Sequence, residues 1–142
     1  PALSGGSCRC KSPDAATDVT GFGLGGHALE MARGAQCDIR IDWPAVPLLA
    51  GTRELAARGF VTGASERNWS GYGADVILPA GFTALDRALL TDPQTSGGLL
   101  VACAPTALPA VLSTFAQHSF AGAATIGEVG PSRACARLTV RP

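Results

Sequence analysis

The segment TDVTGFGLGGHALEMA, residues 17–32, places a carboxylate and a glycine-rich turn in front of a helical pattern. Free backbone N–H groups at the start of a helix bind anions such as phosphate. Asp18 lies just before the glycines, and its charge would repel a phosphate unless a cation lay between them. Mg²⁺ suits that position because it accepts one or two carboxylates together with phosphate oxygens and water. The segment therefore predicts a metal–nucleotide site with Asp18 as metal ligand.

Gly21, Gly23 and Gly26 also fit the dinucleotide-binding pattern G-x-G-x-x-G. That pattern needs a buried strand before the turn and an acid about 20 residues after it. The preceding CRCKSPDAATDV contains no apolar strand, and Asp38 and Asp42 are explained as the polar face of an alternating strand. The dinucleotide interpretation is therefore disfavoured. The glycines also have a structural explanation, since they let a helix start pack closely against another backbone.

A second polar stretch, DPQTSGGLL at residues 92–100, has two interpretations that the residues leave open. It can bind phosphate through a nest of backbone N–H groups. It can also be a loop whose side chains satisfy their own backbone. The nucleotide-binding candidates from the two stretches are Thr20, Gly21, Gly23, Thr95, Ser96 and Gly97. His27 is interpreted as a packing or capping residue, and no residue is assigned as catalytic.

The elements that must position these residues follow from periodicity and turn signals. Apolar residues at helical spacing predict helices over residues 22–33, 46–59 with a break near Gly51, 83–90 and 105–118. Gly34 is expected to end the first helix. The helix over residues 105–118 is expected to bury Leu108, Val111, Leu112 and Phe115.

Alternating or continuous apolar runs predict strands over residues 37–43, 74–78, 99–104, 123–129 and 134–140. The run LLVACA is typical of a covered strand. Residues 61–73 are expected to form a long polar loop, in which Arg67, Asn68 and Tyr72 could face a cleft. The fold class is α/β (α+β layered), a mixed sheet covered by helices on one face.

Composition narrows the function classes. Charged residues make up 15% of the 142 residues, the formal net charge is zero and no Lys/Arg run occurs, which disfavours nucleic acid and membrane partners. Without an apolar signal segment the chain is expected to be cytoplasmic, with its five cysteines reduced. A structural zinc at Cys8 and Cys10 is disfavoured because no second ligand pair accompanies them. So few charges predict that another domain or subunit covers part of the surface.

The stretches ATDVTGFGLGGHALEMA and DPQTSGGLL together resemble the C-terminal domain of the selenophosphate synthetase (selenide, water dikinase) family. That domain is shared with aminoimidazole ribonucleotide synthetase and related ATP-using enzymes. The segments VPLLAGTRELAARGFVTGASERNWSGYG and AATIGEV are similar to family segments as well. The resemblance runs from about residue 16 to residue 129.

The resemblance implies an enzyme that converts ATP, selenide and water to selenophosphate, AMP and phosphate. It implies a homodimer that holds ATP and Mg²⁺ through several aspartates, of which Asp18 matches the one from the C-terminal domain. Residues 1–14 are expected to be a loose leader and residues 15–142 the C-terminal domain, with the N-terminal ATP-binding domain absent. The family's nucleophile and nearby lysine lie upstream of the matching segments, so Cys8 and Cys10 are not assigned that role.

On this interpretation the isolated chain is inactive. Two alternatives remain: a noncatalytic binding or assembly module derived from this domain, and a different ATP-using enzyme of the same superfamily.

Overall fold

The computed structural model describes residues 14–132 and 134–142. The expected leader, including Cys8 and Cys10, lies almost entirely outside the described residues. The strands are β1 (Ala15–Asp18), β2 (Cys37–Asp42), β3 (Val76–Ile77), β4 (Leu99–Ala102), β5 (Gly127–Ser132) and β6 (Leu138–Arg141). The α-helices are α1 (Gly23–Ala35), α2 (Thr52–Ala57), α3 (Gly63–Tyr72), α4 (Ala84–Leu90) and α5 (Leu108–Gln117). Two short 3₁₀ helices are η1 (Trp43–Ala45) and η2 (Gly73–Asp75).

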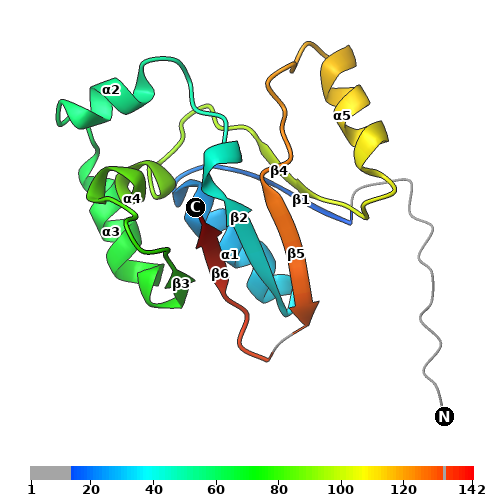
Figure 1. Cartoon of the computed structure of the whole chain (residues 1–142), viewed down its shortest axis with the longest axis horizontal. Coiled ribbons are helices and arrows are strands. Elements are labelled where there is room, and N and C mark those ends of the chain that lie inside the picture. Colours follow the sequence, from blue (N-terminus) through cyan, green and yellow to red (C-terminus); the bar gives the residue numbers. More distant parts are fainter. Residues whose placement is uncertain (1–13, 133) are drawn as a thin grey trace.

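Four strands form a mixed sheet in the order β3-β6-β2-β5 (Figure 1). Strand β6 is parallel to both β3 and β2, whereas β5 is antiparallel to β2. Helix α1 packs against β2 and β6, and α3 and α4 pack against α1. This arrangement confirms the expected α/β class with a mixed sheet and a helical layer.

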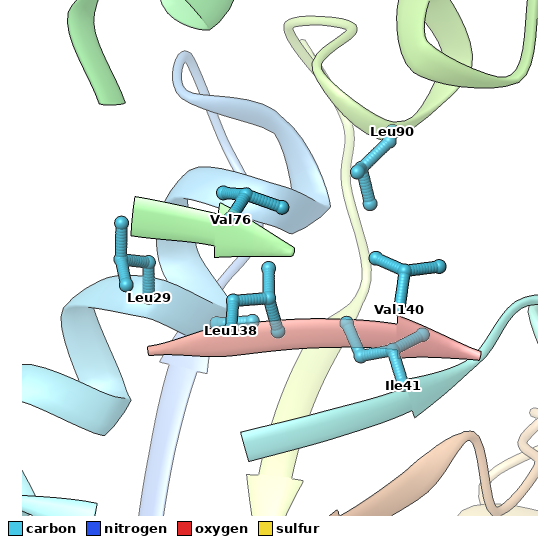
Figure 2. Close-up of a cluster of buried hydrophobic side chains, with 7 residues drawn as sticks. Leu29, Ile41, Val76, Leu90, Leu138 and Val140 are labelled. Carbon is cyan, nitrogen blue, oxygen red and sulfur yellow. The ribbon is translucent and has the colours of Figure 1, made fainter. Parts of the chain in front are cut away.

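The core lies between α1 and the sheet. Ala28 and Leu29 of α1 are buried against β2, β3 and β6, and Leu90 at the end of α4 belongs to the same cluster. Figure 2 shows these apolar side chains pointing toward one another from the helices and from strands β2, β3 and β6. On the strands the core side chains are Ile41, Val76, Leu138 and Val140. Successive side chains of β2 and β6 point to opposite faces of the sheet, so every second residue of these strands faces the core.

Strands β1 and β4 form a separate two-stranded antiparallel ribbon. The apolar run of β4 predicted a covered strand, and this was wrong, because Leu99 is 56% exposed and the rest of β4 is only half-buried. Among the described residues β1 and β4 pair only with each other, so both outer edges of the ribbon are open. The ribbon carries the start of one candidate stretch and the end of the other.

Four further expectations need correction. Residues 63–72 form α3 instead of a polar loop. Helix α1 does not end at Gly34 but continues to Ala35, and Gln36 adopts the left-handed conformation with φ 50°. The apolar side of α5 is only half-buried, and Figure 1 shows α5 beyond β5, at the opposite end of the molecule from α2. Strand β5 starts at Gly127, later than the pattern predicted.

Large apolar side chains are exposed around α2. They are Leu48, Leu49, Leu55, Phe60 and Val61, and Leu49 is 84% exposed. Such a group of neighbouring apolar residues on a surface is typical of a face that contacts other protein. No helix in residues 14–132 or 134–142 has the length and apolar character needed to cross a membrane.

Candidate functional site

Asp18 is the last residue of β1 and lies opposite Leu99, the first residue of β4. Its side chain is exposed. Within the described part of the chain, its carboxylate takes part in no hydrogen bond or ion pair, and only its backbone oxygen accepts a bond, from the Thr17 hydroxyl. A carboxylate in this state is available to a cation.

The glycine-rich turn after β1 leads directly into α1. The Gly23 N–H donates to the Thr20 carbonyl over 3.0 Å, and Gly23 has φ 69°, which favours glycine. A Cβ at Gly23 would lie 2.6 Å from the Thr91 carbonyl carbon. The expected close approach of the helix start to another backbone is therefore confirmed at Gly23, whereas a Cβ at Gly21 would meet nothing within 4 Å.

No side chain caps the start of α1. The residue before the helix, Phe22, makes no side-chain hydrogen bond to it, and the first turn contains no acidic residue. The N–H groups of a first helical turn have no partners within the helix itself. The Gly23 N–H of this turn donates to Thr20, and Gly23 and Gly25 are buried, so anion binding at the start of α1 stays a prediction.

The second stretch packs against the first through backbone contacts. The Gln94 N–H donates to the Thr20 carbonyl over 3.0 Å, and the Val19 N–H donates to the Gly98 carbonyl over 3.0 Å. Gly97 lies so close to Val19 that a Cβ there would overlap the Val19 carbonyl oxygen. The structure thus brings Thr95, Ser96 and Gly97, all exposed, beside the turn that follows Asp18.

Helix α3 holds the two stretches together, and sequence reasoning missed it. The Asn68 side-chain amide donates to the Gly21 carbonyl over 2.9 Å and to the Thr91 carbonyl over 3.0 Å. The Tyr72 hydroxyl donates to the Phe22 carbonyl over 2.7 Å. The signal that could have revealed α3 is Thr62, whose side chain caps the helix by accepting the Ser65 N–H.

Asn68→Ala is expected to lower the free energy of unfolding by about 1–3 kcal/mol, because two backbone carbonyls lose their donor. Chemical denaturation of both proteins measures the difference. Arg67→Ala is the matched control, since Arg67 is the exposed neighbour on the same helix and should change stability by less than about 0.5 kcal/mol. Equal stability of the two variants would contradict the role given to Asn68.

Tyr72 offers a spectroscopic test of the same packing. Burial raises its pKa from 10.0 to about 12, against the opposing effect of the Gly26 backbone hydrogen bond. Tyr72 is the single tyrosine of the chain, so the ultraviolet absorbance of tyrosinate reports on it alone. The midpoint of the Tyr72 titration is expected near pH 12 in the folded chain and near pH 10 in denaturant. Because the pKa of Tyr72 is higher in the folded chain, its contribution to the free energy of unfolding is complete below pH 10. That contribution is lost as the pH rises toward 12.

The acid of the second stretch has a structural role. The Asp92 carboxylate accepts from the Gln94 side chain over 3.2 Å and lies 3.4 and 3.5 Å from the hydroxyls of Thr62 and Ser65. For Asp92 this supports the interpretation of a loop that satisfies its own polar groups. The side chains of Thr95 and Ser96 are exposed and make no such contact with other described residues.

The described residues contain no group of three or more His, Cys, Asp or Glu side chains that could hold a metal ion. Asp18 therefore fits a cation only as a single ligand of a shared site. A hollow lies elsewhere, lined by Asp38, Arg40, Arg137 and Thr139. A smaller one is lined by Leu55, Phe60, Val61 and Asp92. Cys37, Cys103 and Cys135 are free thiols.

Comparison with known proteins identifies the family. The family described as AIR synthase related protein, C-terminal domain, matches residues 10–137. The chain is similar to proteins named selenide, water dikinase. It is 57% identical over 121 residues to the one from Burkholderia orbicola (strain MC0-3), covering 84% of this chain and 34% of the relative. It is 56% identical over 115 residues to that of Pseudomonas straminea, covering 81% and 32%.

The relative from Rhizobium meliloti (strain 1021), also named selenide, water dikinase, is 49% identical over 131 residues, which are 91% of this chain and 37% of the relative. The chain thus spans about a third of the length of the curated relatives it matches. The matched region contains both candidate stretches. The chain belongs to the family of AIR synthase related proteins, as their C-terminal domain.

Proposed function

We propose that this chain acts as the C-terminal domain of an ATP-dependent selenophosphate synthetase and supplies Asp18 as a ligand of Mg²⁺ bound to ATP. The observation that carries the proposal is the exposed Asp18 carboxylate, which has no partner among the described residues and lies beside an uncapped helix start. Such a carboxylate and such a helix end together suit a cation that carries phosphate. The similarity to proteins named selenide, water dikinase supports the choice of reaction.

In this proposal the site residues divide into two kinds. Gly23 and Gly97 permit the close backbone contacts that place the two stretches together. Thr20, Gly21, Thr95 and Ser96 are exposed around that contact and face the nucleotide. Mg²⁺, when bound, neutralises charge on the phosphate oxygens and orients them.

A single carboxylate does not hold Mg²⁺ tightly, so other ligands have to come from elsewhere. We propose that a preceding ATP-binding domain supplies them, within the two-thirds of the relatives' length that this chain does not match. The exposed apolar residues around α2 support the presence of a covering domain. In the cytoplasm the complete enzyme works as a homodimer, without nucleic acid or membrane partners.

The test compares the isolated chain with a longer protein that joins it to such an ATP-binding domain. The longer protein is expected to form AMP from ATP in a reaction that requires both Mg²⁺ and selenide. The isolated chain is expected to show no magnesium-dependent ATP turnover. Turnover by the isolated chain would overturn the division of ligands between two domains. Absence of selenide dependence in the longer protein would favour a different phosphoryl acceptor.

A further inference from the structure

Asn68 is a half-buried side chain of α3 that bridges two carbonyl groups far apart in the chain. Its Nδ2 atom donates to the Gly21 carbonyl over 2.9 Å and to the Thr91 carbonyl over 3.0 Å. A side-chain amide nitrogen carries two hydrogens, so both are used. One hydrogen binds the glycine-rich turn, and the other binds the residue just before the second stretch. A hydroxyl, which carries one hydrogen, would serve only one of these carbonyls.

The other polar contacts of α3 in this region each reach one stretch. The Tyr72 hydroxyl donates to the Phe22 carbonyl in the turn over 2.7 Å. At the start of the helix, the Thr62 hydroxyl lies 3.4 Å from a carboxylate oxygen of Asp92 in the second stretch. Asn68 thus connects the two sides that these contacts hold separately.

The hydrogen bond from Asn68 also fixes the peptide group between Gly21 and Phe22. In a planar trans peptide the C=O and the following N–H point in opposite directions. Because the Gly21 carbonyl is turned toward α3, the Phe22 N–H is turned away from it, and this N–H donates no hydrogen bond among the described residues. Gly21 is exposed, a Cβ there would meet nothing within 4 Å, and glycine has wide backbone freedom. The packing around Gly21 therefore does not hold this peptide in place, whereas Asn68 does.

We propose that Asn68 is a positioning residue of the nucleotide site, which fixes both the Gly21–Phe22 peptide and the spacing between the glycine-rich turn and the second stretch. The inference rests on the proposed function, in which exposed residues of both stretches face one nucleotide. Asn68 itself touches no ligand. Without it the two stretches have to be ordered when ATP binds, which costs affinity, while the chemical step is largely unaffected.

The first test determines whether both side-chain amide hydrogens of Asn68 are bonded inside the protein. Asn68 is the single asparagine of the chain, so labelling asparagine alone with nitrogen-15 gives one pair of side-chain amide signals in NMR. Both hydrogens are expected to exchange with water more slowly in the folded chain than in the chain unfolded in urea. Exchange of either hydrogen at the unfolded rate would overturn the bridge between the two carbonyls.

The second test measures KM for ATP and kcat in the longer protein that joins this chain to an ATP-binding domain. Asn68→Ala is expected to raise KM about tenfold and to change kcat by less than about threefold, because two hydrogen bonds that order the site are lost. Asn68→Asp keeps the shape but has no amide hydrogens, so it should raise KM at least as much as Asn68→Ala. Arg67→Ala, at the exposed neighbouring position, should leave both constants within about twofold.

The outcomes distinguish this inference from the proposed function. If the unsubstituted longer protein forms no AMP from ATP with Mg²⁺ and selenide, the proposed function is overturned, and the inference with it. If that protein is active but Asn68→Ala has the KM of Arg67→Ala, or loses kcat instead, the inference alone is overturned. A role in filling space would make Asn68→Asp resemble the unsubstituted protein, which also overturns it. All assays are run at a temperature at which thermal unfolding shows each variant to be folded.

Discussion

Gly97→Ala is expected to lower the free energy of unfolding of this chain by about 3 kcal/mol, near the upper end for overpacking. The reason is geometric, because the added Cβ would overlap the carbonyl oxygen of Val19 and also lie 2.9 Å from Gln94 Cβ. To remove this overlap, the second stretch has to move away from the end of β1. The hydrogen bond from the Val19 N–H to the Gly98 carbonyl would then be lost or lengthened.

The adjacent residue provides a matched control. A Cβ at Gly98 would meet nothing within 4 Å, so Gly98→Ala is expected to change the free energy of unfolding by less than about 1 kcal/mol. Equilibrium denaturation in urea with tryptophan fluorescence measures both variants. If Gly97→Ala proves as stable as Gly98→Ala, the close contact between the two stretches is wrong.

Asp18→Asn is expected to reduce kcat of the longer, ATP-consuming protein by roughly 100-fold, because a metal contact on a reacting phosphate contributes several kcal/mol. Asparagine has nearly the same shape but lacks the negative charge that attracts Mg²⁺. The carboxylate is exposed and has no partner among the described residues, so stability should be unchanged. The measurement is the rate of AMP formation across a range of Mg²⁺ concentrations.

Asp14→Asn supplies the comparison for that experiment, since Asp14 is an exposed aspartate just before β1, outside the candidate site. It should keep kcat within about twofold. Reduced activity of Asp18→Asn that high Mg²⁺ partly restores would support a role in metal binding. Full activity of Asp18→Asn would remove the central residue of the proposed function.

The parts of the fold that the sequence predicted are those with a strong local pattern. Strand β2 and the capped helix α4 are examples, because an element that buries one face has apolar residues at regular spacing in its sequence. The sequence of helix α3 has no such regular spacing of apolar residues. It contains two glycines, and it contributes to the fold through side chains such as Asn68 that bind backbone far away in the chain.

The candidate site was predictable to a similar degree. The chemistry of Asp18 beside a helix start is local and could be derived from a few neighbouring residues. The contact between Gly97 and Val19 depends on how β1 and β4 pair, which spacing alone does not specify. The contact between the Thr20 hydroxyl and the His27 ring likewise depends on how the turn places Thr20 against α1.

The two-stranded ribbon of β1 and β4 has a dynamic consequence. Two strands alone are marginally stable in water, and this pair lies outside the four-stranded sheet with most of its side chains exposed or half-buried. Segments with little buried apolar surface open locally at low free-energy cost and exchange their amide hydrogens sooner than the core. Asp18 thus lies on a part of the molecule that the proposed ATP-binding domain would hold in place by covering it.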